Sequence, residues 1–242
     1  MASFDQYSQR YRNIRMERRN GILQMTFHSN GGSLQWGGTP HEEFPRAFHD
    51  IGSDPDNRVV IMTGTGEAFS GPPGTPQSIP RRTPREWDKT YWEGKHLLMN
   101  LLDIEVPMIS AVNGPAPRHS ELPLLCDIVL AAEEASFQDS GHFINGLVPG
   151  DGMHIVYPLL LGLNRGRYFL LTGQTIRARE ALDLGLVSEV LPQQDLLPRA
   201  RPLASLMRPP FWYMRSGTRV KPALPTLPIR PVSSLFLSRI LR

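Results

Sequence analysis

The sequence has few of the features that mark secreted and membrane proteins. It holds one cysteine, Cys126, among 242 residues, so no disulfide bond can form within the chain, and a reducing compartment such as the cytoplasm is expected. No run approaches the roughly 18 apolar residues of a transmembrane helix. Residues 1–19 are polar and mixed in charge, unlike a secretory signal. With 40% hydrophobic residues, a chain of this length can bury one sizeable core.

Acidic residues are missing from the C-terminal part of the chain. Asp195 is the last of the 23 acidic residues, whereas nine of the 26 Lys and Arg residues follow it. Residues 1–195 therefore carry 17 basic against 23 acidic residues, and the net charge of +3 comes from the tail. Eight of the 23 prolines also lie in these last 47 residues, and proline interrupts helices. We divide the chain into a core, 1–195, and a basic, proline-rich tail, 196–242.

The tail has two interpretations. Clustered Arg and Lys attract polyanions, so it could act as an arm for nucleic acid or a membrane surface. Its basic residues are scattered singly, however, which favours an end without such a role, and we expect neither nucleic acid nor membrane as a partner. The abrupt change in composition after Ala200 is also what an out-of-frame translation would produce, and we keep that as a hypothesis.

Several motifs that identify enzyme classes are absent. Neither G-x-x-x-x-G-K-[ST] nor G-x-G-x-x-G occurs, which argues against a P-loop or dinucleotide fold, even though residues 64–84 are rich in Gly and Pro. There is no H-E-x-x-H, no Cys–His pairing and no two-carboxylate cluster along the sequence, so we expect no metal. No G-x-S-x-G elbow supports a Ser-His-Asp triad.

The core does show strands alternating with helices, which indicates the α/β class. Buried strands are predicted at 21–28, 58–66, 106–114 and 127–133. A helix is predicted to begin after Thr83, because Pro84 and Glu86 complete a capping box. Five residues of that helix recur at helical spacing and are expected to face the core: Trp87, Tyr91, Leu98, Leu101 and Leu102. Two later helices, within 166–173 and 177–185, each end at a glycine.

Four of the seven histidines lie in or beside predicted loops, where sites are usually built: His41, His119, His142 and His154. Imidazole titrates near neutral pH, and a carboxylate such as Asp151 could fix its tautomer and raise its basicity enough to deprotonate water. Asp151 in "PGDG" is also a good turn residue, so the residues themselves leave both interpretations open.

Five longer segments of the sequence together resemble those of a known protein family. "RVVIMTGTGEAFSG", "IEVPMISAVNGPA", "ELPLLCDIVLAAEEASFQ", "GLVPGDG" and "LTGQTIRAREALDLGLVSEVLP" occur in this order within residues 12–195. Together they resemble the crotonase (enoyl-CoA hydratase/isomerase) superfamily. The resemblance implies an α/β crotonase fold, a spiral of ββα units with two nearly perpendicular sheets and surrounding helices. It also implies assembly as a homotrimer or hexamer, provided that the tail permits it.

The departures from the hydratases resemble one branch, 6-oxocamphor hydrolase and related β-diketone hydrolases. "APRHSELP" replaces the glycine run that precedes Glu-Leu, His142 stands near a catalytic glutamate position, and Asp151 replaces a small residue. The branch implies that His142 and Asp151 activate water and that His119 contacts the diketone carbonyl and the enolate. It further implies an active-site role for His41 and a place for Trp36 in the pocket wall. Glu121 is expected either to orient His119 or to cap a helix.

The implied activity is hydrolysis of a carbon–carbon bond in a cyclic or bicyclic 1,3-diketone, a retro-Claisen reaction that yields a keto acid. A small-molecule diketone would be the substrate, and no cofactor would be needed. Two alternatives remain at this point. One is a CoA-dependent enoyl-CoA hydratase or isomerase, which the lost glycine run disfavours. The other is an inactive crotonase-like remnant. The resemblance implies charged amphipathic helices in this region, one of which supplies a carboxylate to the pocket, whereas this tail has no acidic residue.

Overall fold

A six-stranded sheet forms the centre of the computed structural model, which describes residues 2–71 and 83–207. The strand order is β1-β2-β3-β4-β5-β8, and every neighbouring pair is parallel except β1 and β2. Its strands are β1 (Ile14–Arg19), β2 (Ile22–Phe27), β3 (Val59–Thr63), β4 (Met108–Val112), β5 (Ile128–Ala132) and β8 (Glu189–Leu191). The four strands predicted from sequence are confirmed as β2 to β5. All residues of β3 and β4 are buried, as expected where helices cover a parallel sheet.

A second sheet of two antiparallel strands stands beside the first. It consists of β6 (Ser136–Phe137) and β7 (Ile176–Arg177). The backbone N–H of Ala116 donates to the carbonyl of Ser136 at 2.7 Å, so the segment that leaves β4 is tied to β6. This tie brings residues 116–121 next to residues 138–142, and the candidate site is built where the two segments meet.

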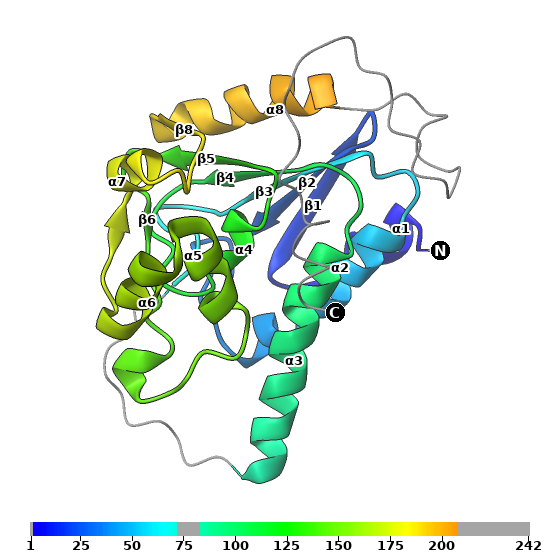
Figure 1. The fold of residues 1–242 in the computed structure, drawn as a ribbon. Coiled ribbons are helices and arrows are strands. Elements are labelled where there is room, and N and C mark those ends of the chain that lie inside the picture. The colour runs from blue at the N-terminus through cyan, green and yellow to red at the C-terminus, as the bar shows by residue number, and fades with distance from the viewer. Residues whose placement is uncertain (1, 72–82, 208–242) are drawn as a thin grey trace, which may run out of the picture.

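Helices cover the main sheet. They are α1 (Phe4–Tyr7), α2 (Gly38–Ser53), α3 (Pro84–Leu102), α4 (Glu121–Leu124), α5 (Met153–Leu161), α6 (Leu163–Thr172), α7 (Ala178–Asp183) and α8 (Leu196–Met207), with 3₁₀ turns η1 (Phe143–Asn145) and η2 (Gln193–Asp195). Helix α8 packs on β3, β4 and β5, while α2, α4 and α5 lie on the opposite side of the sheet (Figure 1). Helices α2 and α3 pack against each other, and so do α5 and α6. The predicted α/β class is confirmed, with a mainly parallel sheet and surrounding helices.

Helix α3 begins as predicted, but part of its predicted core face is wrong. Thr83 and Glu86 form the capping box, with the Thr83 backbone N–H donating to the Glu86 carboxylate at 2.6 Å. The leucines at positions 98, 101 and 102 are buried. Trp87 and Tyr91, in contrast, are 37% and 57% exposed. The reason is geometric, because the first half of α3 extends away from the body of the molecule and has no core beside it (Figure 1).

Glycines end two helices in the predicted way. Gly173 follows α6 with φ +63°, and Gly185 lies just after α7 with φ +76°. This left-handed backbone is easily adopted only by glycine, and it lets the chain turn sharply out of each helix.

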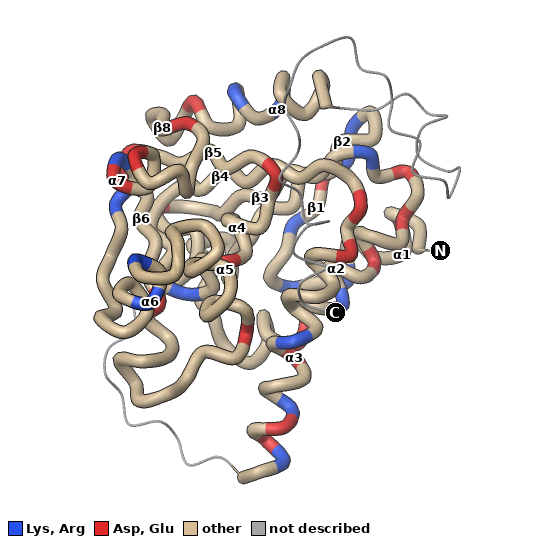
Figure 2. Tube along the Cα trace, in the orientation of Figure 1, with Lys and Arg blue, Asp and Glu red and all other residues tan. Residues whose placement is uncertain are grey.

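The first 12 residues of the predicted tail, 196–207, form α8. Leu196, Ala200 and Ala204 are buried, so this segment takes part in the packing of the main sheet even though Pro202 lies inside the helix. Residues 208–242 lie outside the described residues. They include seven of the nine basic residues of the tail and the segment considered as a possible arm. Across the described elements, Lys and Arg are interspersed with Asp and Glu (Figure 2). None of the helices in the described ranges is long and apolar enough to cross a membrane.

Candidate active site

The first part of the candidate site is built by the turn between β4 and α4. His119 has φ +49°, an uncommon conformation for a residue other than glycine. This turn leads directly into α4, whose first residue is Glu121. Glu121 is fully buried, and its Oε1 lies 2.7 Å from His119 Nδ1. Of the two roles expected for Glu121, the geometry therefore favours contact with His119.

His41 and Trp36 complete this part of the site from the N-terminal side of α2. His41 lies in the first turn of that helix, and its Nε2 is 3.2 Å from His119 Nε2. The Trp36 ring lies 4.1 Å from the His119 ring, measured between centroids, and 5.5 Å from that of His41. The indole N–H of Trp36 is buried without a hydrogen-bond partner among the described residues. Such a donor is costly to leave unpaired, so it is available to a bound ligand.

The second part of the site comes from the segments that precede η1 and α5. His142 stands directly before η1, and Asp151 lies two residues before α5. His142 Nε2 is 3.3 Å from Asp151 Oδ2, and the side chains are 18% and 11% exposed. Gly152, which stands between Asp151 and the start of α5, has φ +101°, and a side chain there would collide with Leu98 of α3. The chain bends at Asp151 and Gly152, and the Asp151 carboxylate faces His142.

Asp139 was missed by the sequence analysis. Its Oδ1 lies 2.8 Å from His142 Nδ1, and its side chain is almost fully buried. Asp151 was expected to fix the tautomer of its histidine, but that position, at Nδ1, belongs to Asp139, and Asp151 faces the other ring nitrogen. The signal lay in "FQDSGHF", where Asp139 and His142 are three residues apart, within reach of each other across a short turn.

Asp151 joins the two parts, because its Oδ2 is also 3.6 Å from His119 Nδ1. The fold thus assembles all six residues predicted from the sequence: Trp36, His41, His119, Glu121, His142 and Asp151. His154, the remaining loop histidine, is exposed in the first turn of α5. The roles of the six residues stay a prediction.

The two central histidines have opposite protonation. Burial lowers the pKa of His119 to about 4, although nearby Asp151 partly opposes this. Burial also works against a charged His142, but its bonds to Asp139 and Asp151 outweigh that effect and raise its pKa to about 10. At neutral pH, His119 is therefore a neutral imidazole and His142 an imidazolium.

The two carboxyl groups near His119 also differ. Burial raises the pKa of Glu121 well above its ordinary value, and the charge of Asp151 raises it further. Burial would raise the pKa of Asp151 too, but the bond from His142 and the positive charge of that ring lower it below its ordinary range. The raised pKa of Glu121 and the lowered pKa of His119 both favour a hydrogen bond between neutral groups at this 2.7 Å contact, with the proton on Glu121 and Nδ1 as the acceptor. Environments that shift the pKa values of two neighbouring titratable groups in opposite directions are typical of acid–base sites.

Three of these groups have the composition of a metal site. His119, Glu121 and Asp151 offer ligand atoms that lie within 4.8 Å of one another. The sequence analysis found no two-carboxylate cluster, because Asp151 joins the other two only in the folded chain. The arrangement does not suit a cation as it stands, since burial raises the pKa of Glu121 and so disfavours the carboxylate that a metal needs, and its Oε1 is bonded to His119 Nδ1, an atom that could bind the metal.

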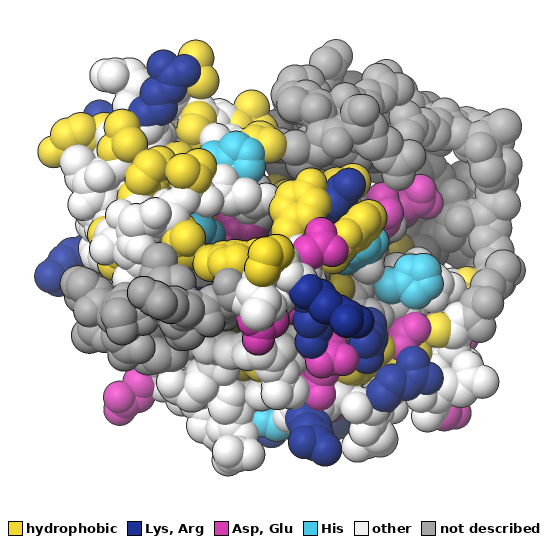
Figure 3. Space-filling view, turned by 90° about the horizontal axis from the view of Figure 1, so that it is seen from below, with side chains coloured by type: hydrophobic (Ala, Val, Ile, Leu, Met, Phe, Trp, Pro, Cys, Tyr) yellow, Lys and Arg dark blue, Asp and Glu magenta, His cyan; other side chains and the backbone are white. Residues whose placement is uncertain are grey.

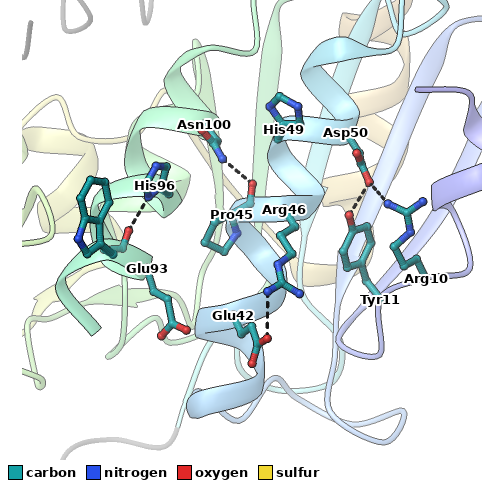
Figure 4. Close-up of a pocket in the computed structure, with 11 residues that line it drawn as sticks. Arg10, Tyr11, Glu42, Pro45, Arg46, His49, Asp50, Glu93, His96 and Asn100 are labelled. Carbon is teal, nitrogen blue, oxygen red and sulfur yellow. Dashed lines mark hydrogen bonds and ion pairs between the residues drawn. The ribbon is translucent and has the colours of Figure 1, made fainter. Parts of the chain in front are cut away.

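A separate groove lies between α2 and α3, with a volume of about 520 Å³ (Figure 4). Arg10 pairs there with Asp50, and Arg46 with Glu42, each within about 3.1 Å. None of the six predicted residues lines this groove. From below, hydrophobic side chains gather near the middle of the molecule beside Lys and Arg side chains (Figure 3). The six residues predicted from the sequence lie outside the groove between α2 and α3, in the less exposed cluster around His119.

Comparison with known proteins identifies the family. The family model for enoyl-CoA hydratase/isomerase matches residues 17–211. The chain belongs to this family. The superfamily resemblance inferred from the sequence is therefore confirmed. Among curated members, a probable enoyl-CoA hydratase of Mycobacterium leprae is 30% identical over 181 residues, which covers 74% of this chain and 67% of the relative. A carnitinyl-CoA dehydratase of Salmonella agona is 35% identical over 161 residues, which covers 65% of this chain and 60% of that relative.

Solved structures of the family include a more similar protein. A β-diketone hydrolase from the cyanobacterium Anabaena sp. PCC 7120, bound to (S)-3-oxocyclohexyl acetic acid, is 48% identical with a TM-score of 0.83. The match covers 97% of this chain and 88% of that protein. The enoyl-CoA hydratase of Bacillus anthracis is 26% identical with a TM-score of 0.70, and the match covers 81% and 76% of the two chains. The chain therefore has the family fold over the core and is more similar to the hydrolase than to this hydratase.

Proposed function

We propose that the protein hydrolyses a carbon–carbon bond of a cyclic or bicyclic 1,3-diketone and releases a keto acid. The observation that carries the proposal is the pairing of His142 Nε2 with Asp151 Oδ2 at 3.3 Å, close to neutral His119 and the Trp36 ring. The ligand of the Anabaena hydrolase has a ketone and a carboxylic acid in one molecule, as such a cleavage would produce. This similarity supports the same class of substrate for the present chain.

The first step adds water to one carbonyl. The water binds at His142 Nε2 and Asp151, and His142, once it has lost its proton, accepts a proton from the water while Asp151 orients it. The hydroxide forms a bond to the carbonyl carbon, and the carbonyl oxygen becomes the oxyanion of a tetrahedral adduct. His142 is then an imidazolium between two carboxylates, which stabilise its charge.

The second step breaks the carbon–carbon bond. The electron pair of that bond moves to the central carbon and is delocalised onto the second carbonyl as an enolate. With the proton of this contact on Glu121, the hydrogen of the neutral His119 ring lies on Nε2, which is 3.2 Å from His41 Nε2. The enolate oxygen of the substrate would replace His41 as the acceptor of this hydrogen. The indole N–H of Trp36 is a further donor. The proton that His142 took from the water is then returned to the central carbon, which completes the keto acid and restores neutral His142, so the net change is addition of one water.

The experiment is incubation of the protein with cyclic and bicyclic 1,3-diketones, without cofactor, while acid release is followed. His142→Ala should lower kcat by about 10²–10⁴-fold, the usual loss when a general base is removed. His96→Ala is a suitable control, because His96 lies on α3 and its Nδ1 bonds to the Trp92 carbonyl. The proposal is wrong if no dione releases acid.

CoA-dependent hydration or isomerisation is the second candidate. It is favoured by the family relatives, which include a probable enoyl-CoA hydratase, and by the buried Glu121 at the start of α4. In this chain, however, the acid is bonded to His119. Calorimetry with CoA and an enoyl-CoA thioester tests this candidate, and tight binding followed by hydration would favour it over the diketone.

A further inference from the structure

Asp139 lies behind His142, on the side of the ring away from Asp151. Its Oδ1 accepts from His142 Nδ1 at 2.8 Å and from the backbone N–H of Gly141 at 3.1 Å. The side chain is 1% exposed, and its Oδ2 has no hydrogen-bond partner among the described residues. A carboxylate buried in this way needs a positive partner, and the charged partner it contacts is His142.

The contact decides which ring nitrogen of His142 carries a hydrogen in the neutral state. A carboxylate oxygen only accepts hydrogen bonds, so Nδ1 must hold the hydrogen that Asp139 accepts. The lone pair of a neutral His142 is then on Nε2, which faces Asp151. Without Asp139, either nitrogen could carry the hydrogen, and the ring could also rotate about its side-chain bonds.

We propose that Asp139 is a positioning residue: it holds His142 with Nε2 toward the reaction centre and stabilises the imidazolium that forms when His142 takes a proton from water. This inference rests on the function proposed above. The arrangement is that of the Asp–His pair in serine hydrolases, where the buried carboxylate orients the imidazole and does not itself become protonated.

A purely structural role for Asp139 predicts something different. The bond from the Gly141 N–H closes a short turn, and an asparagine oxygen would close it equally well. Asp139→Asn therefore keeps the shape and the turn but removes the negative charge. If the turn were all that mattered, this variant would behave like the wild type.

The titratable groups around His142 come from several segments. Asp139 and Asp151 contact its two nitrogens, while His119 and Glu121 lie beyond Asp151 and Arg118 lies near Asp139. Asp139→Asn changes only one of these groups. The expected effects are a loss of kcat of about 10²–10⁴-fold with little change in KM, and a shift to lower pH of the midpoint at which kcat/KM rises. Asp139→Glu, which restores the charge, should bring that midpoint back toward the wild-type value.

The matched control is Asp54→Asn, since Asp54 is also a buried carboxylate but pairs with Arg18 at 2.7 Å in another part of the fold. Asp54→Asn is expected to lower stability without moving the pH midpoint. The inference is overturned if Asp139→Asn keeps the wild-type kcat and midpoint, or if both variants lower kcat equally with the midpoint unchanged.

A measurement without substrate separates this inference from the proposed function. The ring of His142 is titrated by NMR in the wild type, Asp139→Asn and Asp54→Asn. A midpoint that falls in Asp139→Asn alone supports the positioning role, even if the wild type cleaves no diketone and the proposed function is wrong. A midpoint that is the same in all three proteins overturns the positioning role, even if the wild type is an active diketone hydrolase.

Discussion

Asp151 Oδ2 lies 3.3 Å from His142 Nε2 and so occupies the side of the ring where the attacking water would bind. The same oxygen is 3.6 Å from His119 Nδ1, so one carboxylate contacts both histidines that the mechanism uses. In the proposed mechanism, this position lets Asp151 link water activation at His142 to enolate stabilisation at His119.

Replacement of the Asp151 carboxylate by an amide removes its negative charge and keeps its shape, so it tests the role of the charge. We expect Asp151→Asn to lower kcat for acid release by about 10²–10⁴-fold, because the water loses an acceptor and His142 loses one of the carboxylates that stabilise its charge. Steady-state kinetics with a cyclic dione measures the loss. Asp183→Asn on the exposed end of α7 serves as the control. Turnover by Asp151→Asn at the wild-type rate would contradict the assigned role.

The pH dependence follows from His142. Its carboxylate partners raise its pKa to about 10, so the neutral form that accepts a proton is scarce at pH 7 and becomes more abundant as the pH rises. The kcat/KM for diketone cleavage should therefore increase with pH, by about tenfold per unit, up to the apparent pKa of the His142–Asp151 pair. The pH dependence of kcat/KM, which reports the pKa values of the free enzyme, measures this. A profile that is flat from neutral to alkaline pH would show that His142 is not the base.

Stability should depend on the same group with a defined sign. Because the folded-state pKa of His142 lies above its ordinary value of 6.5, its contribution to stability is complete below that value and is lost as the pH rises through about 10. Urea unfolding across this range should show a lower free energy of unfolding at the alkaline end. In His142→Ala this alkaline decline should be smaller, and an equal decline in both proteins would contradict the shift.

Much of the fold could be predicted from local patterns. The apolar runs of β2 to β5 mark strands because parallel strands covered on both faces are apolar throughout. Gly173 and Gly185 mark helix ends because they adopt a left-handed backbone. Trp87 and Tyr91 were assigned wrongly because helical spacing shows which residues share a face but not whether the core extends far enough to cover it.

The candidate site was harder to predict, because its partners come from separate segments. Their place in loops singled out His119 and His142, with Asp151 as a possible partner, and the resemblance implied their roles. The sequence could not reveal that Asp151 lies between the two histidines or that burial raises the pKa of Glu121. Those properties depend on burial and on distances in the folded chain. Asp139 was missed because a lone aspartate in a turn is common, and only its 2.8 Å contact with His142 distinguishes it.

The two faces of α3 provide a test of the fold. Leu101 is 1% exposed, so Leu101→Ala should lower the free energy of unfolding by about 2–5 kcal/mol through the lost contacts and the cavity left behind. Tyr91 is 57% exposed, and Tyr91→Ala should change it by no more than about 1 kcal/mol. Urea denaturation of both variants gives the comparison. A larger loss for Tyr91→Ala would mean that the first half of α3 is covered in solution.

The Glu121→Gln variant should give different results for the two candidate reactions, diketone hydrolysis and CoA-dependent hydration or isomerisation. The raised pKa of Glu121 favours a neutral acid that donates to His119 Nδ1, and the amide of glutamine can donate to the same atom. If the protein is a diketone hydrolase, Glu121→Gln should therefore keep kcat within about tenfold of the wild type, whereas Glu121→Ala should lose more because His119 is no longer held. If Glu121 instead acts as the base of a CoA-dependent reaction, glutamine should abolish turnover as fully as alanine does. Rates of both variants with a dione and with an enoyl-CoA thioester decide between these outcomes, and equal losses of diketone cleavage in the two variants would contradict the neutral state of Glu121.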